Sequence, residues 1–466
     1  MKLNPTFSKL AILAVVSGLL CFVLAEIGGL ARERQFRQRE AALNVEQSLA
    51  GPQALAGPAL VRTCRETWTA PGPDKKEVTE TRDFRLFAAA QSLAVKGGIS
   101  PEVRHRGLFK VNTYASQLQL DARWASLAAL EPRAEHANGR LACDAVVAFV
   151  ALSDPRGVRS AEVRRDGQAL AALPGGHHAD YPGGLHVVLP DLRLNAPLEL
   201  SIKLTLVGSR RLGVVPAADR TEVTLQSSWP HPSFFGQFLP TTHQVGASGF
   251  TAQWQVSSLA STAVAEMAAG RALPPLSVDD DAPRPPSPPS PPYGPNAKAP
   301  VGGLDVMAVE LIDPVNPYVM SDRAIKYGLM FIALTFVTVG LTELLTRRRV
   351  HPVQYLLVGL ALALFFLLLL SLSEHLPFGL AYSCAAAAAA LVLTQYAAAM
   401  FGGWRRGLAF GGGIALLYGA LYVLLSREQT ALVIGAVLLF TVLAAVMTLT
   451  RRLDWYRLGS EPPAHG

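Results

Sequence analysis

The chain has 466 residues, half of them hydrophobic and only 17% charged, with a pI near 9.3. That composition is typical of a membrane protein. Residues 31–322 hold 29 Lys/Arg and 29 Asp/Glu, whereas the other segments hold 13 Lys/Arg and 6 Asp/Glu, which supplies the whole net charge of +7. Basic charge gathered around apolar segments indicates membrane topology. We therefore expect the lipid bilayer as a partner and no nucleic acid.

Six segments have the roughly 20 apolar residues that a helix needs to cross the hydrocarbon core. The first follows Lys2 and Lys9 and resembles a secretory signal, but its apolar run is long. Glu33 and Arg34 also stand where small residues would mark a cleavage site. We predict an uncleaved signal-anchor helix over residues 1–31. The segments are 7–30, 324–346, 353–373, 378–400, 407–426 and 430–450.

The short loops between the later spans predict the orientation. Arg347–Arg349, Arg405-Arg406 and Arg451-Arg452 all fall on one side, which the positive-inside rule makes cytoplasmic. An even number of spans then places both termini in the cytoplasm. The expected location is the bacterial inner membrane, as a multi-pass protein with a large periplasmic domain.

Alternating side chains predict strands in the domain after the anchor. Leucine and isoleucine alternate with polar residues over Leu198–Leu206, and the pattern recurs over Leu118–Trp124. Asp166-Gly167 between two short runs predicts a tight hairpin turn. Because no long helix interrupts these strands, we expect an all-β, antiparallel, sandwich-like domain over residues 32–273, opening on a helical extension of the anchor. The number of sheets stays open.

Eleven prolines occur from Pro274 to Pro300, and such a segment forms neither helix nor internal sheet. We interpret residues 274–303 as a linker or insertion, with a Pro-x-x-Pro recognition role as the weaker alternative. A last strand and lead-in follow over 304–322. Residues 323–452 form a transmembrane bundle of five helices, and 453–466 form a cytoplasmic tail. The fold class is thus a membrane α-helical bundle plus an all-β periplasmic domain.

The sequence offers little chemistry. It has no Gly-x-Ser-x-Gly, Cys-x-x-Cys, His-Glu-x-x-His or P-loop motif. His177, His178, Asp180 and His186 lie among glycines and prolines, and we interpret them as a solvated loop rather than metal ligands. Acidic residues of the spans lie near helix ends, where they do not form a buried relay. We predict no catalytic, cofactor-binding or metal residues, and no cofactor.

Two of the four cysteines, Cys64 and Cys143, fall in the oxidising compartment, where disulfides persist. From the sequence alone two outcomes are equally open: the two cysteines form a disulfide, or both are buried as free thiols.

Several motifs together resemble the CreD family of bacterial inner-membrane proteins, in order and spacing along nearly the whole chain. Two features depart from the family's pattern, which are the proline-rich insertion and Cys64, where an aromatic residue is more typical. The motifs are Pro101–Gly107, Phe238–Pro240, Gly249–Trp254, Asp322–Phe336, His351–Gly359 and Leu367–His375.

The resemblance implies a non-enzymatic protein that supports cell-envelope integrity and the envelope-stress response, including the response to β-lactam damage. Its periplasmic domain would contact envelope proteins or other envelope components. A transporter or lipid-handling protein is the alternative, and would need a polar cavity lined by Gln354, Tyr355 or Glu343. A periplasm-facing hydrolase is the second alternative, and would need a Ser, His and Asp cluster in the β-domain.

Overall fold

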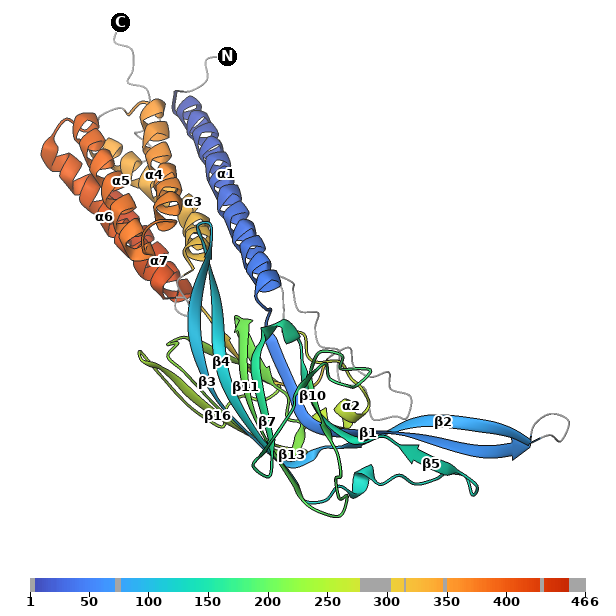
Figure 1. Cartoon of the computed structure of the whole chain (residues 1–466). Coiled ribbons are helices and arrows are strands. Elements are labelled where there is room, and N and C mark those ends of the chain that lie inside the picture. Colours follow the sequence, from blue (N-terminus) through green and yellow to red (C-terminus); the bar gives the residue numbers. More distant parts are fainter. Residues whose placement is uncertain are drawn as a thin grey trace, which may run out of the picture. The chain divides into compact units, whose positions relative to one another are not determined.

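The computed structural model describes residues 5–71, 77–276, 303–313, 316–346, 350–427 and 431–451. Most of the proline-rich segment, Arg347–Arg349 and the tail predicted over 453–466 lie outside the described residues. Contacts divide the chain into two compact units, one formed by residues 1–39 and 315–466 and the other by residues 40–314. Apolar helices thus form one unit and strands the other, as the fold class predicted (Figure 1).

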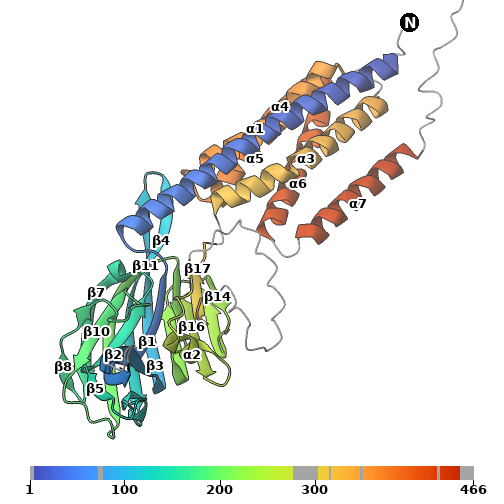
Figure 2. The same cartoon turned by 90° about the vertical axis from the view of Figure 1, so that its right-hand side faces the viewer.

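Six long helices make up the part of the first unit that the structure describes (Figure 2). Among the described residues, five are long and apolar enough to cross a membrane, and α7 contributes the shorter apolar stretch Val433–Thr448. The helix predicted to extend the anchor is confirmed, since α1 continues to Ser48. The helices are α1 (Pro5–Ser48), α3 (Pro317–Thr346), α4 (Pro352–Ser373), α5 (Phe378–Met400), α6 (Trp404–Ser426) and α7 (Ala431–Thr450).

Small residues let the helices of this unit approach closely. Leu24 of α1 fits against Gly328 of α3, where an added Cβ would lie 3.0 Å from the leucine methyl carbon. Elsewhere in the bundle, Tyr382 of α5 donates a hydrogen bond to the Tyr418 carbonyl oxygen of α6 at 2.6 Å. Helix packing in a bilayer depends on such close contacts because lipid supplies little hydrophobic driving force between helices.

Two sheets form the second unit, and the predicted strands are confirmed within them. The purely antiparallel arrangement was wrong, because β1 pairs with β12 and β3 pairs with β13 in parallel, so both sheets are mixed. The nine-stranded sheet contains β1 (Gln53–Pro71), β2 (Glu77–Ala88), β5 (Arg140–Cys143), β6 (Val146–Leu152), β9 (Leu173–Pro174), β10 (Gly184–Leu189), β12 (Arg211–Val214), β14 (Pro232–Gly236) and β17 (Met307–Leu311). The eight-stranded sheet contains β3 (Ala90–Arg106), β4 (Phe109–Trp124), β7 (Val158–Arg165), β8 (Gln168–Leu170), β11 (Leu198–Ser209), β13 (Ala218–Ser227), β15 (Thr242–Gly246) and β16 (Gly249–Ser257).

The main core lies between the two sheets. Trp124 and Trp254 of the eight-stranded sheet pack there with Leu60 and Val150 of the nine-stranded sheet. The nine-stranded sheet is also covered on its other face, where Met267 of the short helix α2 (Ala263–Ala268) joins a second cluster. Strand β6 is consequently buried at every residue. The eight-stranded sheet instead alternates buried and exposed residues, so its outer face is open to solvent.

Two hairpins extend beyond the sandwich (Figure 1). Strands β1 and β2 pair from Leu60 with Ala88 to Pro71 with Glu77, and β5 pairs with part of β1. Strands β3 and β4 pair as far as Arg106 with Phe109. A third, smaller hairpin confirms the predicted Asp166-Gly167 turn, because both residues have positive φ, 48° and 83°, between β7 and β8.

Candidate functional site

The outer face of the eight-stranded sheet carries polar side chains in rows that cross the strands. The registers of β7, β11, β4, β3, β13 and β16 place one outward residue of each strand beside the next. Six strands about 4.8 Å apart make each row about 24 Å long. The row that we name the amide row consists of Ser160, Thr205, Gln117, Gly98, Gln226 and Thr251. The row that we name the lysine row consists of Glu162, Lys203, Gln119, Lys96, Thr224 and Gln253.

The amide row has no charged member, and every side chain in it is an amide or a hydroxyl apart from the glycine. Each can both donate and accept hydrogen bonds. Depressions run along it, and two of them meet at Gly98 and Gln226. A Cβ added at Gly98 would meet no atom within 4 Å, so this glycine leaves open space above the sheet. The surface can therefore accommodate an extended polar ligand.

The neighbouring Gly97 has the opposite surroundings. Its added Cβ would clash with a methyl group of Leu118 and lie 3.0 Å from one of Leu225, both in the core. Gly97 faces inward because successive residues of a strand point to opposite faces. Of these two adjacent glycines, Gly97 thus allows close packing in the core and Gly98 leaves space at the surface.

Toward the other end of the sheet, charged side chains are engaged in a hydrogen bond and an ion pair. Ser201 donates a hydrogen bond to Asp121 at 2.7 Å, and Arg123 lies 3.3 Å from Glu199 in an ion pair. These residues line a further depression next to the lysine row. The two rows and this charged end together form the polar face, as we name it below.

A second polar cluster lies in the β1–β2 arm, where the Glu66 carboxylate is fully buried. Its Oε1 accepts hydrogen bonds from the backbone N–H groups of Glu135 and His136 at 3.0 and 2.9 Å. Arg82 forms an ion pair with its Oε2 at 3.4 Å. Trp68 stacks on the His136 ring with centroids 3.9 Å apart. The cluster holds the loop before β5 against the arm, which is a structural task.

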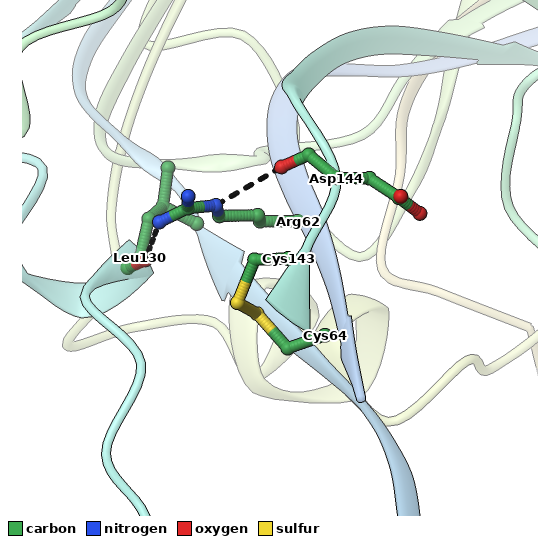
Figure 3. Close-up of a disulfide and its surroundings, with 5 residues drawn as sticks. All are labelled: Arg62, Cys64, Leu130, Cys143 and Asp144. Atoms are coloured by element: carbon green, nitrogen blue, oxygen red, sulfur yellow. Dashed lines mark hydrogen bonds between the residues drawn. A yellow bond between two sulfur atoms is a disulfide. The ribbon is translucent and has the colours of Figure 1, made fainter. Parts of the chain in front are cut away.

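The structure joins Cys64 and Cys143 by a disulfide at the base of the arm, with Cα atoms 4.0 Å apart (Figure 3). The two residues face each other across β1 and β5, and Cys64 is buried. Beside the bridge, Arg62 donates hydrogen bonds to the carbonyl oxygens of Asp144 at 3.1 Å and Leu130 at 3.3 Å. The bridge and these bonds fix β5 to the middle of β1.

The histidines near residue 180 take up structural positions. The expected solvated loop was wrong for His178, which is 9% exposed and stacks on Phe149. Burial, and then the nearby Arg85, lower the pKa of His178, while Asp180 opposes them. His186 lies 2.7 Å from the Gly175 carbonyl oxygen. Among the residues that the structure describes, no group of three or more His, Cys, Asp or Glu side chains could hold a metal.

The polar residues named for the transporter alternative form hydrogen bonds near helix ends. Tyr355 of α4 donates a hydrogen bond to Glu343 of α3 at 3.0 Å. Gln354 accepts the backbone N–H of His351 at 3.0 Å in a capping box that starts α4. These contacts join α3 to α4 and begin a helix.

The polar face was not predicted as a site from the sequence, although the alternation of its strands was visible. The polar members of β4 and β11 were evident as outward residues, but their row partners lie in strands far away in sequence. The Glu66 cluster was missed for the same reason, since its partner His136 is 70 residues away.

Comparison with known proteins places the chain among inner-membrane proteins. The family model described as Inner membrane protein CreD matches residues 5–456. The Inner membrane protein CreD of Escherichia coli (strain K12) is 34% identical over 458 residues, which cover 97% of this chain and 94% of that protein.

Solved structures give only remote likenesses. An M1 zinc metallopeptidase from Deinococcus radiodurans is 11% identical with a TM-score of 0.19, covering 36% of this chain and 38% of that one. The leukotriene A4 hydrolase of Saccharomyces cerevisiae is 10% identical with a TM-score of 0.18, covering 35% and 27%. Scores this low carry no argument about activity.

Proposed function

We propose that this chain, which belongs to the CreD family of inner membrane proteins, supports cell-envelope integrity without being an enzyme. In this proposal its β unit lies in the periplasm and holds an envelope glycan on the polar face. Loss of that contact weakens the response to envelope stress, including β-lactam damage. The observation that supports the proposal is the amide row, with its open floor at Gly98.

The side chains of the two rows suit a glycan better than a protein. Protein interfaces are enriched in aromatic residues and depleted in Lys and Glu at their centres. The amide and lysine rows contain no aromatic or aliphatic side chain, and two lysines lie within the lysine row, which ends on a glutamate. Amides and hydroxyls instead match the hydroxyl and acetamido groups of a wall glycan. Lys96 and Lys203 add charge for its carboxylates.

Binding of this kind depends on repetition. A single hydrogen bond contributes only about 0.5–1.5 kcal/mol net. A row about 24 Å long can engage several residues of one polymer at once, and linked contacts raise the overall affinity without any strong single contact. We therefore expect weak binding to short fragments and firm retention on intact wall material.

Gly98 provides the test. In a strain that lacks the chain, the gene with Gly98→Ala should restore β-lactam resistance and envelope integrity as well as the wild type does. Gly98→Trp should fail, because its indole would occupy the space above the amide row. The measurements are the inhibitory β-lactam concentration and the release of a periplasmic reporter protein. Full complementation by Gly98→Trp at wild-type protein levels would contradict the proposal.

A sedimentation assay tests binding to the glycan independently of the cellular role. Full-length protein in detergent should co-sediment with purified peptidoglycan sacculi as the wild type and as Gly98→Ala, but not as Gly98→Trp. Gly97→Ala serves as the folding reference, because crowding in the core costs about 1–3 kcal/mol without touching the polar face. Equal retention of all variants would overturn the glycan as ligand, while the complementation result would still judge the cellular role.

A further inference from the structure

The β3–β4 hairpin continues beyond its sheet as a two-stranded ribbon. On one side, β11 ends at Ser209, which is opposite Thr113 of β4. On the other side, β13 ends at Ser227, opposite Ile99 of β3. The ladder between β3 and β4 nevertheless runs on to Arg106 and Phe109, and Gly107 makes the turn with φ of 60°. We name residues 102–111 the hairpin tip.

The ribbon leaves the β unit at the end where the chain enters and leaves that unit. Ser209 at its base donates a hydrogen bond to the Gly51 carbonyl oxygen at 3.3 Å, three residues after α1 ends at Ser48. Arg210 donates to Asn112 of the ribbon at 3.2 Å. The Arg210 carbonyl oxygen in turn accepts the N–H of Leu311, six residues before α3 begins. Both connections to membrane-spanning helices therefore start beside the ribbon's base.

The ribbon is a long projection. From Thr113 to the Gly107 turn it has six residues, or about 20 Å at the rise of a strand. Its turn therefore lies well beyond the ends of the neighbouring strands β11 and β13.

The side chains of the hairpin tip have the composition of a lipid contact. Arg104, Arg106 and Lys110 are exposed and outnumber Glu102. Leu108, at the turn, is 51% exposed, and Val103 is 47% exposed. Exposed apolar residues among basic ones favour the boundary between headgroups and acyl chains, where long basic side chains reach phosphates.

We propose that the hairpin tip binds anionic phospholipid headgroups in the leaflet on the side of the β unit, with Leu108 at the acyl boundary. The basic side chains contact the phosphates, and the contact fixes the β unit against the membrane. This inference does not depend on the proposed glycan ligand. Each basic side chain near an anionic surface should change the population of the bound tip about fivefold.

Fluorescence from single labelled positions tests the proposal on the full chain in nanodiscs. Cys21 and Cys384 are replaced by serine, and an environment-sensitive dye is attached at Leu108→Cys. Leu259→Cys is the matched control, since Leu259 is 98% exposed and follows β16 at the opposite end of the same sheet. In phosphatidylglycerol-containing discs the dye at position 108 should shift to the blue and brighten, while position 259 should not respond.

Charge dependence decides between lipid classes. The shift at position 108 should be smaller in discs of phosphatidylcholine alone, and should fall with added salt because exposed charges are screened. The triple substitution Arg104→Ser, Arg106→Ser and Lys110→Ser should abolish it. Identical signals at positions 108 and 259 in anionic discs would overturn the proposal. A shift that is equal in both lipids and insensitive to salt would overturn it too. The salt titration uses protein with all three basic residues intact, so it remains decisive even if the triple variant does not fold.

Discussion

At the scale of single residues, Glu66 shows how burial turns a carboxylate into a structural group. The backbone N–H of His136, ahead of the His136 ring and Arg82, lowers the pKa of Glu66 against the opposing effect of burial. A lowered folded-state pKa means that the ionised group stabilises the arm above the ordinary glutamate pKa of about 4.3. That stabilisation is lost as the pH falls through the lower pKa of the folded state.

We expect Glu66→Gln to loosen the β1–β2 arm at pH 7, because the glutamine loses the charge that pairs with Arg82. Hydrogen exchange of peptides from residues 64–71 should become faster in this variant. The difference from the wild type should disappear once the pH falls below the folded-state pKa of Glu66. Glu77→Gln, on the exposed part of the same arm, is the control. Equal exchange of wild type and Glu66→Gln at every pH would refute a role for the ionised carboxylate.

How much the sequence predicts differs among these residues. The outward position of Gln117 and Gln119 follows from the alternation of β4, because a strand's period depends only on its own residues. The partners of Glu66 do not, since His136 reaches it through a loop that a single sequence gives no reason to place there. The exposure of a side chain is therefore predictable within one strand, whereas its contact partners in other segments are not.

At the scale of elements, the same limit explains the strand pairing. Strand β11 was predicted from its alternating leucines because only one of its faces is buried. Strand β6 shows no such alternation, because all seven of its residues are buried, and a second apolar layer from α2 and the loop around it covers its other face. The parallel pairs β1–β12 and β3–β13 join segments more than 100 residues apart, and no local pattern specifies them.

The disulfide is the element-scale feature most open to direct test. The bridge closes a loop with a sequence separation of 79 residues. Closing a loop of that length stabilises by about 4 kcal/mol in the chain-entropy model. We expect purified protein to migrate faster without reductant, and Cys64→Ser and Cys143→Ser to abolish the difference equally. Maleimide labelling of both thiols in intact, oxidised cells would show that no bridge forms.

The proline-rich segment gives a second prediction at this scale. The described residues on either side of it are held together, because Leu304 donates a hydrogen bond to the Ala272 carbonyl oxygen at 3.1 Å. Shortening a loop whose ends already meet changes the closure free energy only slightly. Deletion of Pro283–Pro295 should therefore leave a protease-resistant β unit and normal membrane insertion. Loss of that resistant fragment after the deletion would show that the segment contributes packing.

At the scale of the whole molecule, the two units of the chain suit two different solvents, which are water for the β unit and lipid for the helices. Residues 40–314 bury a core between sheets, as a water-soluble domain does, whereas the helices of residues 1–39 and 315–466 leave many apolar side chains exposed. Leu416 and Phe440 are 71% and 73% exposed in the described helices, which is costly in water and favourable in lipid. This division is predictable from the sequence because it depends on composition over tens of residues rather than on pairing.

The orientation of the whole chain in the membrane is the last prediction, and it depends on charge. The basic residues between and after the spans, including Arg405, Arg406 and Arg451, fall on one predicted side, and Lys and Arg are retained in the cytoplasm during insertion. Alkaline phosphatase, which is active only in the periplasm, should therefore be active when fused after residue 250. The same reporter should be inactive when fused after Arg349, in a loop predicted to face the cytoplasm. The reverse pattern would put the polar face and the hairpin tip in the cytoplasm, where no wall glycan is available. That result would reject the proposed glycan ligand together with the topology, while leaving the lipid contact of the hairpin tip to be judged by its own experiment.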